Sequence, residues 1–340
     1  MVNVKSYVSS NFTKAFLIIF LPFFLIISLV YLVKISALTT QIQITMGELL
    51  QLYSYSVPDI VFYTLPLSFI AALANVLLKL SQDNELIALY ALGLKADKVL
   101  RSLLLLGILF SLLLGAISFL AMPLSKQLYK EFTHTKKSEA KINIVAGKLG
   151  QKFGDYYIYV KEKKGDDTFD NIVIYNRTLK DEEQFFASHD GEIHKNAGVT
   201  SLQLNNGYGY TYSKEKLQQA KYASLEVYDK VETKTFKFED IVEHWAKAAT
   251  NEKRMHRALF FIFVSLIPIL CVYLVAAFSM INPRYQENRS FIVIFVTALG
   301  LYMTASSLEK WGTFIFLILT IIFTFALGRW LFQHRVARYF

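Results

Sequence analysis

The sequence predicts a membrane-embedded bundle of six transmembrane helices, with an antiparallel β domain inserted between the third and fourth helices. Three observations lead to this fold class. Hydrophobic residues make up 54% of the 340 residues, and the mean hydropathy is +0.36. Several apolar runs reach the roughly 20 residues that a helix needs to cross a bilayer. A long polar stretch with short alternating segments separates these runs into two groups.

The apolar runs occur three times before the polar stretch and three times after it. The first run follows a short basic start, and no small-residue cleavage site follows it closely, so we interpret it as an uncleaved helix. Pro66 is expected to kink the second helix because proline lacks a backbone donor. Gly107 and Gly115 are expected to let the third helix approach its neighbours closely. The predicted spans are Ala15–Val33, Val57–Leu80, Ser102–Met122, Ala258–Ile281, Phe291–Leu308 and Thr313–Phe332.

Residues 124–253 differ in kind, since they are charged and contain no apolar run of span length. Turn-forming residues such as Asp190-Gly191 and Asn205-Asn206-Gly207 separate strand-length pieces, which predicts a compact antiparallel sandwich or jelly roll of roughly 100 residues. Segments 124–141 and 241–257 are polar and compatible with helix, so we expect them to extend the neighbouring spans. The predicted strands are Tyr156–Val160, Ile172–Tyr175, Glu182–Ser188, Thr200–Gly207 and Tyr222–Tyr228.

The orientation follows from Lys and Arg in the short loops, which favour the cytoplasmic side. The short loops on one side hold only Lys34 and Lys310. The side that carries both termini holds Lys5, Lys14, Lys79, Lys95, Lys98, Arg101, Arg284, Arg289, Arg335 and Arg338. Both termini are therefore expected in the cytoplasm and the β domain in the periplasm. The predicted domains are 1–123 with three spans, 124–253 with the β domain and its helical extensions, and 254–340 with the other three spans.

No sequence motif indicates catalysis, nucleotide binding or metal binding. The glycines at 147–154 lack the spacing of a phosphate-binding loop. Cys271 is the only cysteine, and the six histidines are scattered; His189 and His194 flank a predicted turn, which favours a surface turn over a metal site. The net charge of +9 does not indicate a nucleic-acid partner, because the basic residues flank apolar runs, where lipid head groups lie. We therefore predict no catalytic residue and no metal ligand.

The loop between the second and third spans, Ser81–Arg101, is too polar to span a membrane. Its apolar residues recur at helical spacing and its charged residues fall largely on the other side, while Gly93 breaks the run. The pattern indicates a short amphipathic helix at about 81–98, on the cytoplasmic face. Such a helix can receive a push from a partner protein, or it can simply join two spans at the interface.

A basic cluster is predicted at the opposite mouth of the bundle. Lys126 and Lys130 are four residues apart, as are Lys253 and Arg257, so each pair shares a helix face. Together with Lys34 they can bind an anionic lipid head group. The alternative is that residues flanking a translocated domain escape the charge rule and are merely solvated. Ionisable residues are almost absent within the spans, so energy for transport would come from a partner.

Four local motifs occur in an order that resembles one known family. They are Ser81–Leu94, Phe186–Ile193, Leu202–Gly207 and Asn282-Pro283-Arg284. Over essentially the whole chain the sequence resembles the LptF/LptG (YjgP/YjgQ) permeases, the membrane subunits of the ABC transporter that exports lipopolysaccharide. The run Gln82-Asp83-Asn84 is more acidic than the family pattern.

The resemblance implies specific partners. A paralogous LptF- or LptG-type subunit, a dimeric LptB-type ATPase that binds ATP and Mg, a periplasmic LptC/LptA-type bridge protein, lipopolysaccharide and membrane lipids are expected. Glu85 matches the acidic position of the family's coupling helix, on which Leu86, Leu89 and Gly93 also lie. Lys34 and the face of Lys126 and Lys130 would lie near lipid A phosphates, and the chain itself would hold no cofactor.

A different class of protein remains open: a membrane-anchored receptor or scaffold whose β domain binds a protein partner. A scaffold has no need of a cytoplasmic docking helix, so Glu85 and its helix distinguish the two. A secondary transporter is disfavoured, because the spans lack ionisable groups and show no evident internal repeat.

Overall fold

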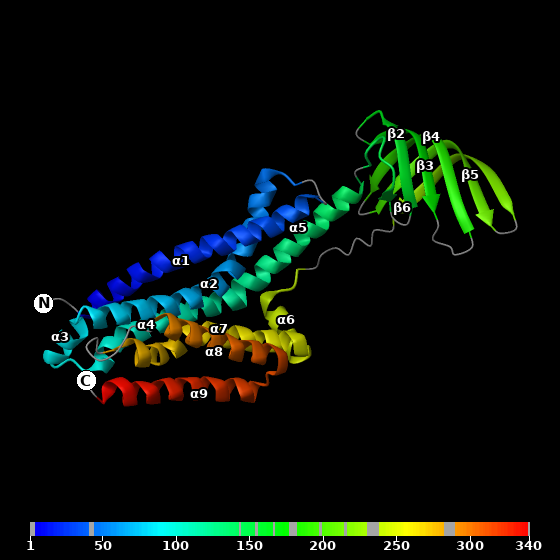
Figure 1. The fold of residues 1–340 in the computed structure, drawn as a ribbon. Coiled ribbons are helices and arrows are strands. Elements are labelled where there is room, and N and C mark those ends of the chain that lie inside the picture. The colour runs from blue at the N-terminus through cyan, green and yellow to red at the C-terminus, as the bar shows by residue number, and fades with distance from the viewer. Residues whose placement is uncertain are drawn as a thin grey trace. The chain divides into compact units, whose positions relative to one another are not determined.

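The computed structural model describes residues 4–40, 44–142, 144–153, 156–165, 167–176, 182–196, 199–213, 216–229, 238–281 and 290–338 (Figure 1). The chain divides into two compact units. A helical unit comprises Met1–Leu38, Thr45–Tyr129 and Phe238–Phe340, and a β unit comprises Thr39–Ile44 and Lys130–Lys237.

Within the described ranges, six helices are long and apolar enough to cross a membrane, which confirms the predicted fold class. These candidate spans are Val4–Ser36, Met46–Gln82, Ala96–Lys136, Glu252–Ser279, Phe291–Trp311 and Phe314–Ala337. The helical elements are α1 (Val4–Ser36), η1 (Ala37–Thr40), α2 (Met46–Gln82), α3 (Glu85–Ala91), α4 (Ala96–Ala116), η2 (Ile117–Ala121), α5 (Met122–Ile142), α6 (Ile241–Ala246), η3 (Lys247–Ala249), α7 (Glu252–Ser279), α8 (Ser290–Trp311), α9 (Phe314–Phe332) and η4 (Gln333–Ala337).

The helices are longer than the predicted spans, because their end turns are polar and hydropathy does not detect them. The clearest case is α2, which begins at a capping box well before the apolar run. The Thr45 backbone N donates to Glu48 Oε2 over 2.8 Å, and the Glu48 backbone N donates to Thr45 Oγ1 over 3.4 Å. This pair satisfies two of the backbone donors that a helix start leaves open. Hydropathy alone therefore locates the membrane-crossing part of α2 and misses its first turns.

Helix α7 lies at the centre of the helical unit and packs against α2, α4, α8 and α9. Gly107 makes the contact between α4 and α7 possible, since a Cβ there would lie 3.0 Å from the carbonyl oxygen of Pro268. The prediction for Gly107 is therefore confirmed. The prediction for Gly115 is wrong, because a Cβ at that position would meet no atom within 4 Å.

The helical extension after the third span is confirmed, since α4, η2 and α5 follow one another without a break. The extension before the fourth span is not one helix. It forms α6 and η3, and α7 then starts anew at Glu252 behind its N-cap Asn251, whose side chain accepts a hydrogen bond from the Arg254 backbone N over 3.3 Å. An Asn side chain competes well for such backbone donors, which favours a new helix start.

The inserted antiparallel β domain is also confirmed. Its described strands form one antiparallel sheet in chain order, which is a meander, in place of the crossed strand order of a jelly roll. One face buries a small apolar core that includes Ile172, Leu202 and Leu204. The strands are β1 (Gln151–Phe153), β2 (Tyr156–Lys163), β3 (Thr168–Asn176), β4 (Glu182–Asn196), β5 (Val199–Ser213) and β6 (Leu217–Asp229).

The turns predicted at Asp190-Gly191 and Asn205-Asn206-Gly207 are wrong, because these residues lie inside β4 and β5. Asn206 has a φ of 52°, in the left-handed region that Asn tolerates, so the strand is locally irregular and continues. Gly207 is required for packing: a Cβ there would collide with the Ala187 carbonyl oxygen and the Tyr222 hydroxyl. The predicted segments are thus parts of longer strands.

Candidate functional site

The first candidate site is α3, at the end of the bundle where both termini lie (Figure 1). Glu85 is its first residue and follows Asn84, which is left-handed with a φ of 57°. The Tyr7 hydroxyl on α1 donates to the Glu85 carboxylate, with distances of 3.0 Å to Oε1 and 2.9 Å to Oε2. The acidic group therefore has a fixed position, and the helix N-terminus adds a favourable partial positive charge.

Helix α3 ends where the sequence predicts a break. Gly93 has a φ of +78°, its backbone N donates to the Tyr90 carbonyl over 2.9 Å, and the Leu94 backbone N donates to the Leu89 carbonyl over 3.2 Å. These two bonds form a Schellman motif, which satisfies the last carbonyls of the helix. The predicted helix at about 81–98 is consequently split: Ser81 and Gln82 end α2, α3 covers Glu85–Ala91, and α4 begins at Ala96.

The apolar residues of α3 have two different environments. Leu86 is buried in the core of the helical unit, and Leu89 is partly buried against that core. Leu92, just after the helix, is 80% exposed. Leu86 and Leu89 thus attach α3 to the bundle, while Leu92 offers an apolar side chain to its surroundings.

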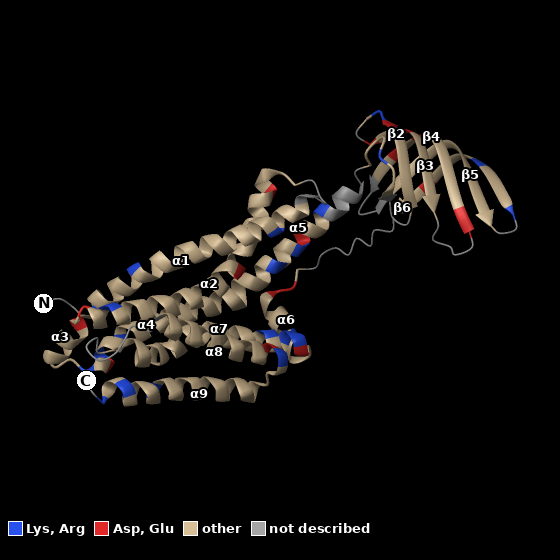
Figure 2. Ribbon diagram, in the orientation of Figure 1, with Lys and Arg blue, Asp and Glu red and all other residues tan. Residues whose placement is uncertain are grey.

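The second candidate site is the basic cluster around α6 and the start of α7, where blue residues gather in Figure 2. Lys126 on α5 does not stand alone there. Its Nζ lies 3.4 Å from Asp59 Oδ1 on α2, and 5.8 Å from the ring centroid of Phe261 on α7. Its charge is therefore partly balanced within the chain.

Glu239 organises the same region, although the sequence analysis does not single it out. Its Oε2 accepts from Arg254 Nη1 over 3.0 Å, and its Oε1 accepts from Lys247 Nζ over 3.0 Å. His244 Nδ1 lies 3.2 Å from Oε2. Arg254 first, and then Lys247, lower the pKa of the Glu239 carboxyl to about 2. The carboxylate stays ionised and holds Arg254 in place.

Three further hydrogen bonds dock this segment onto the third span. The Gln127 side chain pairs with the Glu239 backbone, accepting from its N over 2.8 Å and donating to its carbonyl over 3.1 Å. The indole Nε1 of Trp245 donates to the Phe119 carbonyl over 2.9 Å. Phe119 lies in η2, a π-helical turn, and such turns displace carbonyls from the regular helix ladder.

The other predicted head-group residues are exposed. Lys253 and Arg257 on α7 have no carboxylate within 4 Å among the described side chains. Lys34, in the last turn of α1, is exposed and lies 5.8 Å from the ring centroid of Tyr31. Lys130 on α5 is also exposed but belongs to the β unit. The basic residues thus fall into two groups. Lys126 and Arg254 have acidic partners, whereas Lys34, Lys253 and Arg257 are open to a ligand.

The structure also shows an ionisable residue within a span that the sequence analysis overlooks. Arg329 lies on α9, and its Nη1 is 3.3 Å from the Tyr273 hydroxyl on α7. Gly328 allows this approach, since a Cβ there would lie 3.1 Å from the Leu274 backbone N. Arg329 lies within the predicted span Thr313–Phe332 and could have been identified from the sequence, because an arginine within a span is costly and is retained for a function.

No cluster of three or more metal-ligating side chains is found in the part of the chain that the structure describes. Cys271 is buried and unpaired with any other cysteine. The motif Asn282-Pro283-Arg284 lies outside the described residues.

These features define a class: a polytopic membrane subunit with an inserted antiparallel sheet and a short capped helix between its second and third spans. The model of the LptF/LptG lipopolysaccharide export system permeases matches residues 6–334, and the chain belongs to this family. It is thus a non-catalytic permease subunit of lipopolysaccharide export. None of the curated proteins searched matches its sequence.

Proposed function

We propose that this permease lifts lipopolysaccharide out of the inner membrane and passes it to a periplasmic bridge protein of the LptC/LptA type. It works with a paralogous LptF- or LptG-type subunit and with a dimeric LptB-type ATPase, which binds ATP and Mg. The observation that carries the proposal is the position of α3: a short, capped helix with Glu85 at its start, attached to three spans of the bundle.

The contacts of α3 explain how a displacement of this helix would be transmitted to the neighbouring spans. Tyr7 joins Glu85 to α1, and Leu86 packs in the core shared by α2 and α4. A basic group of the ATPase would pair with the Glu85 carboxylate, and the exposed Leu92 would add an apolar contact. Movement of α3 on nucleotide binding would then displace α1, α2 and α4 together and narrow the cavity shared with the paralogous subunit. Gly93 fixes where the helix ends, so a displacement of α3 would be transmitted to α4 and not absorbed by a flexible loop.

The exposed cations would hold the phosphates of the cargo. Lys34, Lys253 and Arg257 are available in the helical unit, and Lys130 lies further along α5. Lys126 would join them only by exchanging Asp59 for a phosphate. This division sharpens the prediction from sequence, which treats Lys126 and Lys130 as equivalent.

We further propose the orientation given by the basic loops, with both termini and α3 in the cytoplasm and the β unit in the periplasm. The two termini do lie at the same end of the bundle as α3 (Figure 1), which is the arrangement that this orientation requires.

The test is the variant Glu85→Ala in the full complex, with Glu309→Ala at the other end of the bundle as the control. We expect Glu85→Ala to leave membrane insertion intact and to lower both ATPase co-purification and lipopolysaccharide release from proteoliposomes by about tenfold or more, since a charge-assisted contact contributes roughly 1.5–3 kcal/mol. Normal recruitment and release in this variant would remove Glu85 from the mechanism. Recovery of only periplasmic partners would favour a receptor or scaffold.

A further inference from the structure

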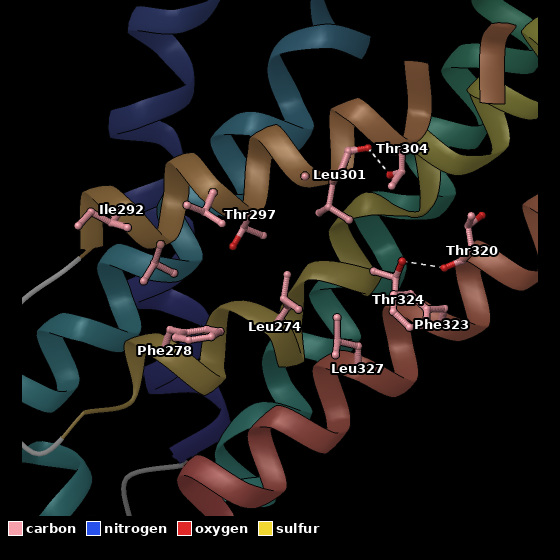
Figure 3. A pocket seen from close by; sticks show the side chains of 13 residues that line it. Leu274, Phe278, Ile292, Thr297, Leu301, Thr304, Thr320, Phe323, Thr324 and Leu327 are labelled. Carbon is pink, nitrogen blue, oxygen red and sulfur yellow. Dashed lines mark hydrogen bonds between the residues drawn. The ribbon is translucent and has the colours of Figure 1, made fainter. Parts of the chain in front are cut away.

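An apolar cavity of about 410 Å³ opens between α8 and α9, beside α7 (Figure 3). It arises because α8 and α9 both pack against α7 and make few contacts with each other. Gly300 on α8 contributes no side chain to it, and a Cβ there would meet nothing within 4 Å. The cavity extends from Ile292 to Thr304 along α8.

Three of the four threonines that line the cavity bond to their own helices and so add little polarity to it. Thr304 donates its hydroxyl to the Leu301 carbonyl over 2.7 Å, and Thr324 donates to the Thr320 carbonyl over 2.7 Å. Thr320 likewise donates to its own helix. Because these hydroxyls bond to carbonyls of their own helices, the threonine surface that faces the cavity is largely apolar.

The length of the cavity matches one leaflet of a bilayer. Twelve residue steps from Ile292 to Thr304 correspond to about 18 Å at about 1.5 Å per residue. Half of the roughly 30 Å hydrocarbon core is about 15 Å. The cavity begins toward the end of the bundle where the termini lie, since Ile292 is near the start of α8 and Phe278 is near the end of α7.

One arginine, Arg335, lies at that end of the cavity. Arg335 stacks on Phe278, with 4.5 Å from its guanidinium carbon to the ring centroid, and Phe278 lines the cavity. Arg329 contacts Tyr273, which does not line the cavity, and lies on another face of α9. The Arg335 guanidinium has no carboxylate within 4 Å in the described ranges and is exposed. An unpaired arginine beside an apolar slot matches a phosphate with an attached acyl chain.

We propose that this cavity holds one acyl chain of an anionic phospholipid, with its phosphate at Arg335. The lipid belongs to the leaflet at the end of the bundle that carries both termini. Bulk lipid tails are as apolar as the cavity, so the cavity alone gives no preference for a particular lipid. Arg335 selects the head group, and the slot orients the molecule. This site does not rest on the transport mechanism proposed above.

The acyl-chain part is tested with phosphatidylglycerol that carries a photoreactive group in one chain. The full-length protein, with the subunits that co-purify, is reconstituted in vesicles containing this lipid, and labelled peptides are mapped. We expect labelling of α8 and α9 at the cavity, and about tenfold less in Gly300→Phe, which fills the slot. Gly115→Phe, also at an open glycine, is the control and keeps the labelling. Equal labelling in all three proteins would overturn the proposal.

The head-group part is tested with Arg335→Gln. We expect labelling by the phosphatidylglycerol probe to fall about tenfold, to the level given by a phosphatidylcholine probe, as expected for the loss of about 1.4 kcal/mol. Arg338→Gln, at the same helix end, is the control. Labelling that does not distinguish the two probes in the wild type would overturn the role of Arg335. Displacement of the probe by lipopolysaccharide, with none by unlabelled phosphatidylglycerol, would assign the cavity to the cargo and overturn the proposal.

Discussion

At the scale of single residues, Tyr7 is the partner that positions Glu85. If the hydroxyl matters only for orientation, Tyr7→Phe leaves the carboxylate charge and loses its fixed geometry. We expect this variant to recruit the ATPase several-fold less tightly, consistent with about 1 kcal/mol for one hydrogen bond, while Glu85→Ala loses more. The measurement is the affinity of the ATPase for the permease complex in nanodiscs. Unchanged affinity would show that Tyr7 is a structural contact only.

Glu239 gives a prediction that depends on pH. Its pKa is lowered to about 2 from an ordinary 4.5, so the carboxylate stabilises the docked α6 fully above about pH 4.5. This contribution is lost as the pH falls from 4.5 toward 2. Hydrogen exchange of the α6 amides should therefore be constant from pH 7 to 5, after correction for intrinsic rates, and rise below 4.5.

The variant Glu239→Gln tests the same group without changing the pH. The carboxyl side chain is 30% exposed and bonds to three basic groups, so we expect a cost of about 1–3 kcal/mol in the local stability of α6. Exchange protection of α6 should fall about tenfold at pH 7 and lose its dependence on pH below 4.5. Protection equal to that of the wild type would mean that Trp245 and Gln127 suffice to dock the segment.

Which residues can be predicted from sequence depends on whether their role is local. Gly93 follows from turn chemistry along one segment, whereas Glu85 is singled out by the family resemblance. Tyr7 cannot be found in this way, because its partner lies 78 residues away. Glu239 cannot either, because its partners His244, Lys247 and Arg254 lie 5, 8 and 15 residues away, which is not a spacing that one regular helix brings together. Arg329 could have been found, since an arginine inside an apolar run is itself a signal.

At the scale of helices, the two glycines of α4 form a matched pair. Gly107→Leu places its Cβ against the Pro268 carbonyl, 3.0 Å away, and should destabilise the packing of α4 on α7 by about 1–3 kcal/mol. Gly115→Leu meets open space and should be neutral. Thermal unfolding in detergent measures the difference. A similar melting temperature for both variants would show that α4 moves aside easily.

Only some of the helix and strand boundaries can likewise be predicted from the sequence. The apolar parts of the spans follow from hydropathy, because the bilayer imposes a length. The polar first turns of α2 and the new start of α7 depend on Thr45 and Asn251 as caps, which hydropathy does not report. In the β unit, Asn206 and Gly207 are typical of a turn in sequence. They nevertheless lie within β5, which continues to pair with both neighbouring strands, and only this pairing reveals it.

At the scale of the whole molecule, the basic cluster predicts how cargo affinity responds to charge removal. The double variant Lys253→Gln with Arg257→Gln should weaken lipopolysaccharide binding about tenfold or more, because both cations are exposed and lack acidic partners among the described side chains. Lys126→Gln should have a smaller effect, since Asp59 already balances it. Binding to the purified complex at two ionic strengths measures both. An equal loss for Lys126→Gln would show that the Asp59 pair opens for cargo.

The division into a helical unit and an inserted sheet follows from the sequence, because the two kinds of segment differ in composition and period. The cavity between α8 and α9 does not, since it depends on how two helices share a third. The residues that line it are of types that are ordinary for a span, so the cavity results from helix packing alone.

The π-helical turn at Ile117–Ala121 has a consequence for the residues that come after it. A π turn holds one more residue than a regular helical path, so it shifts the phase of all later positions by about 100°. The faces of α5 are therefore out of step with those of α4, although the helix continues. Lys126 faces Asp59 in this shifted register. Deleting a single residue from η2 would return the helix to regular α geometry and leave Lys126 and the rest of α5 facing the same neighbours, because the π turn accommodates that one extra residue.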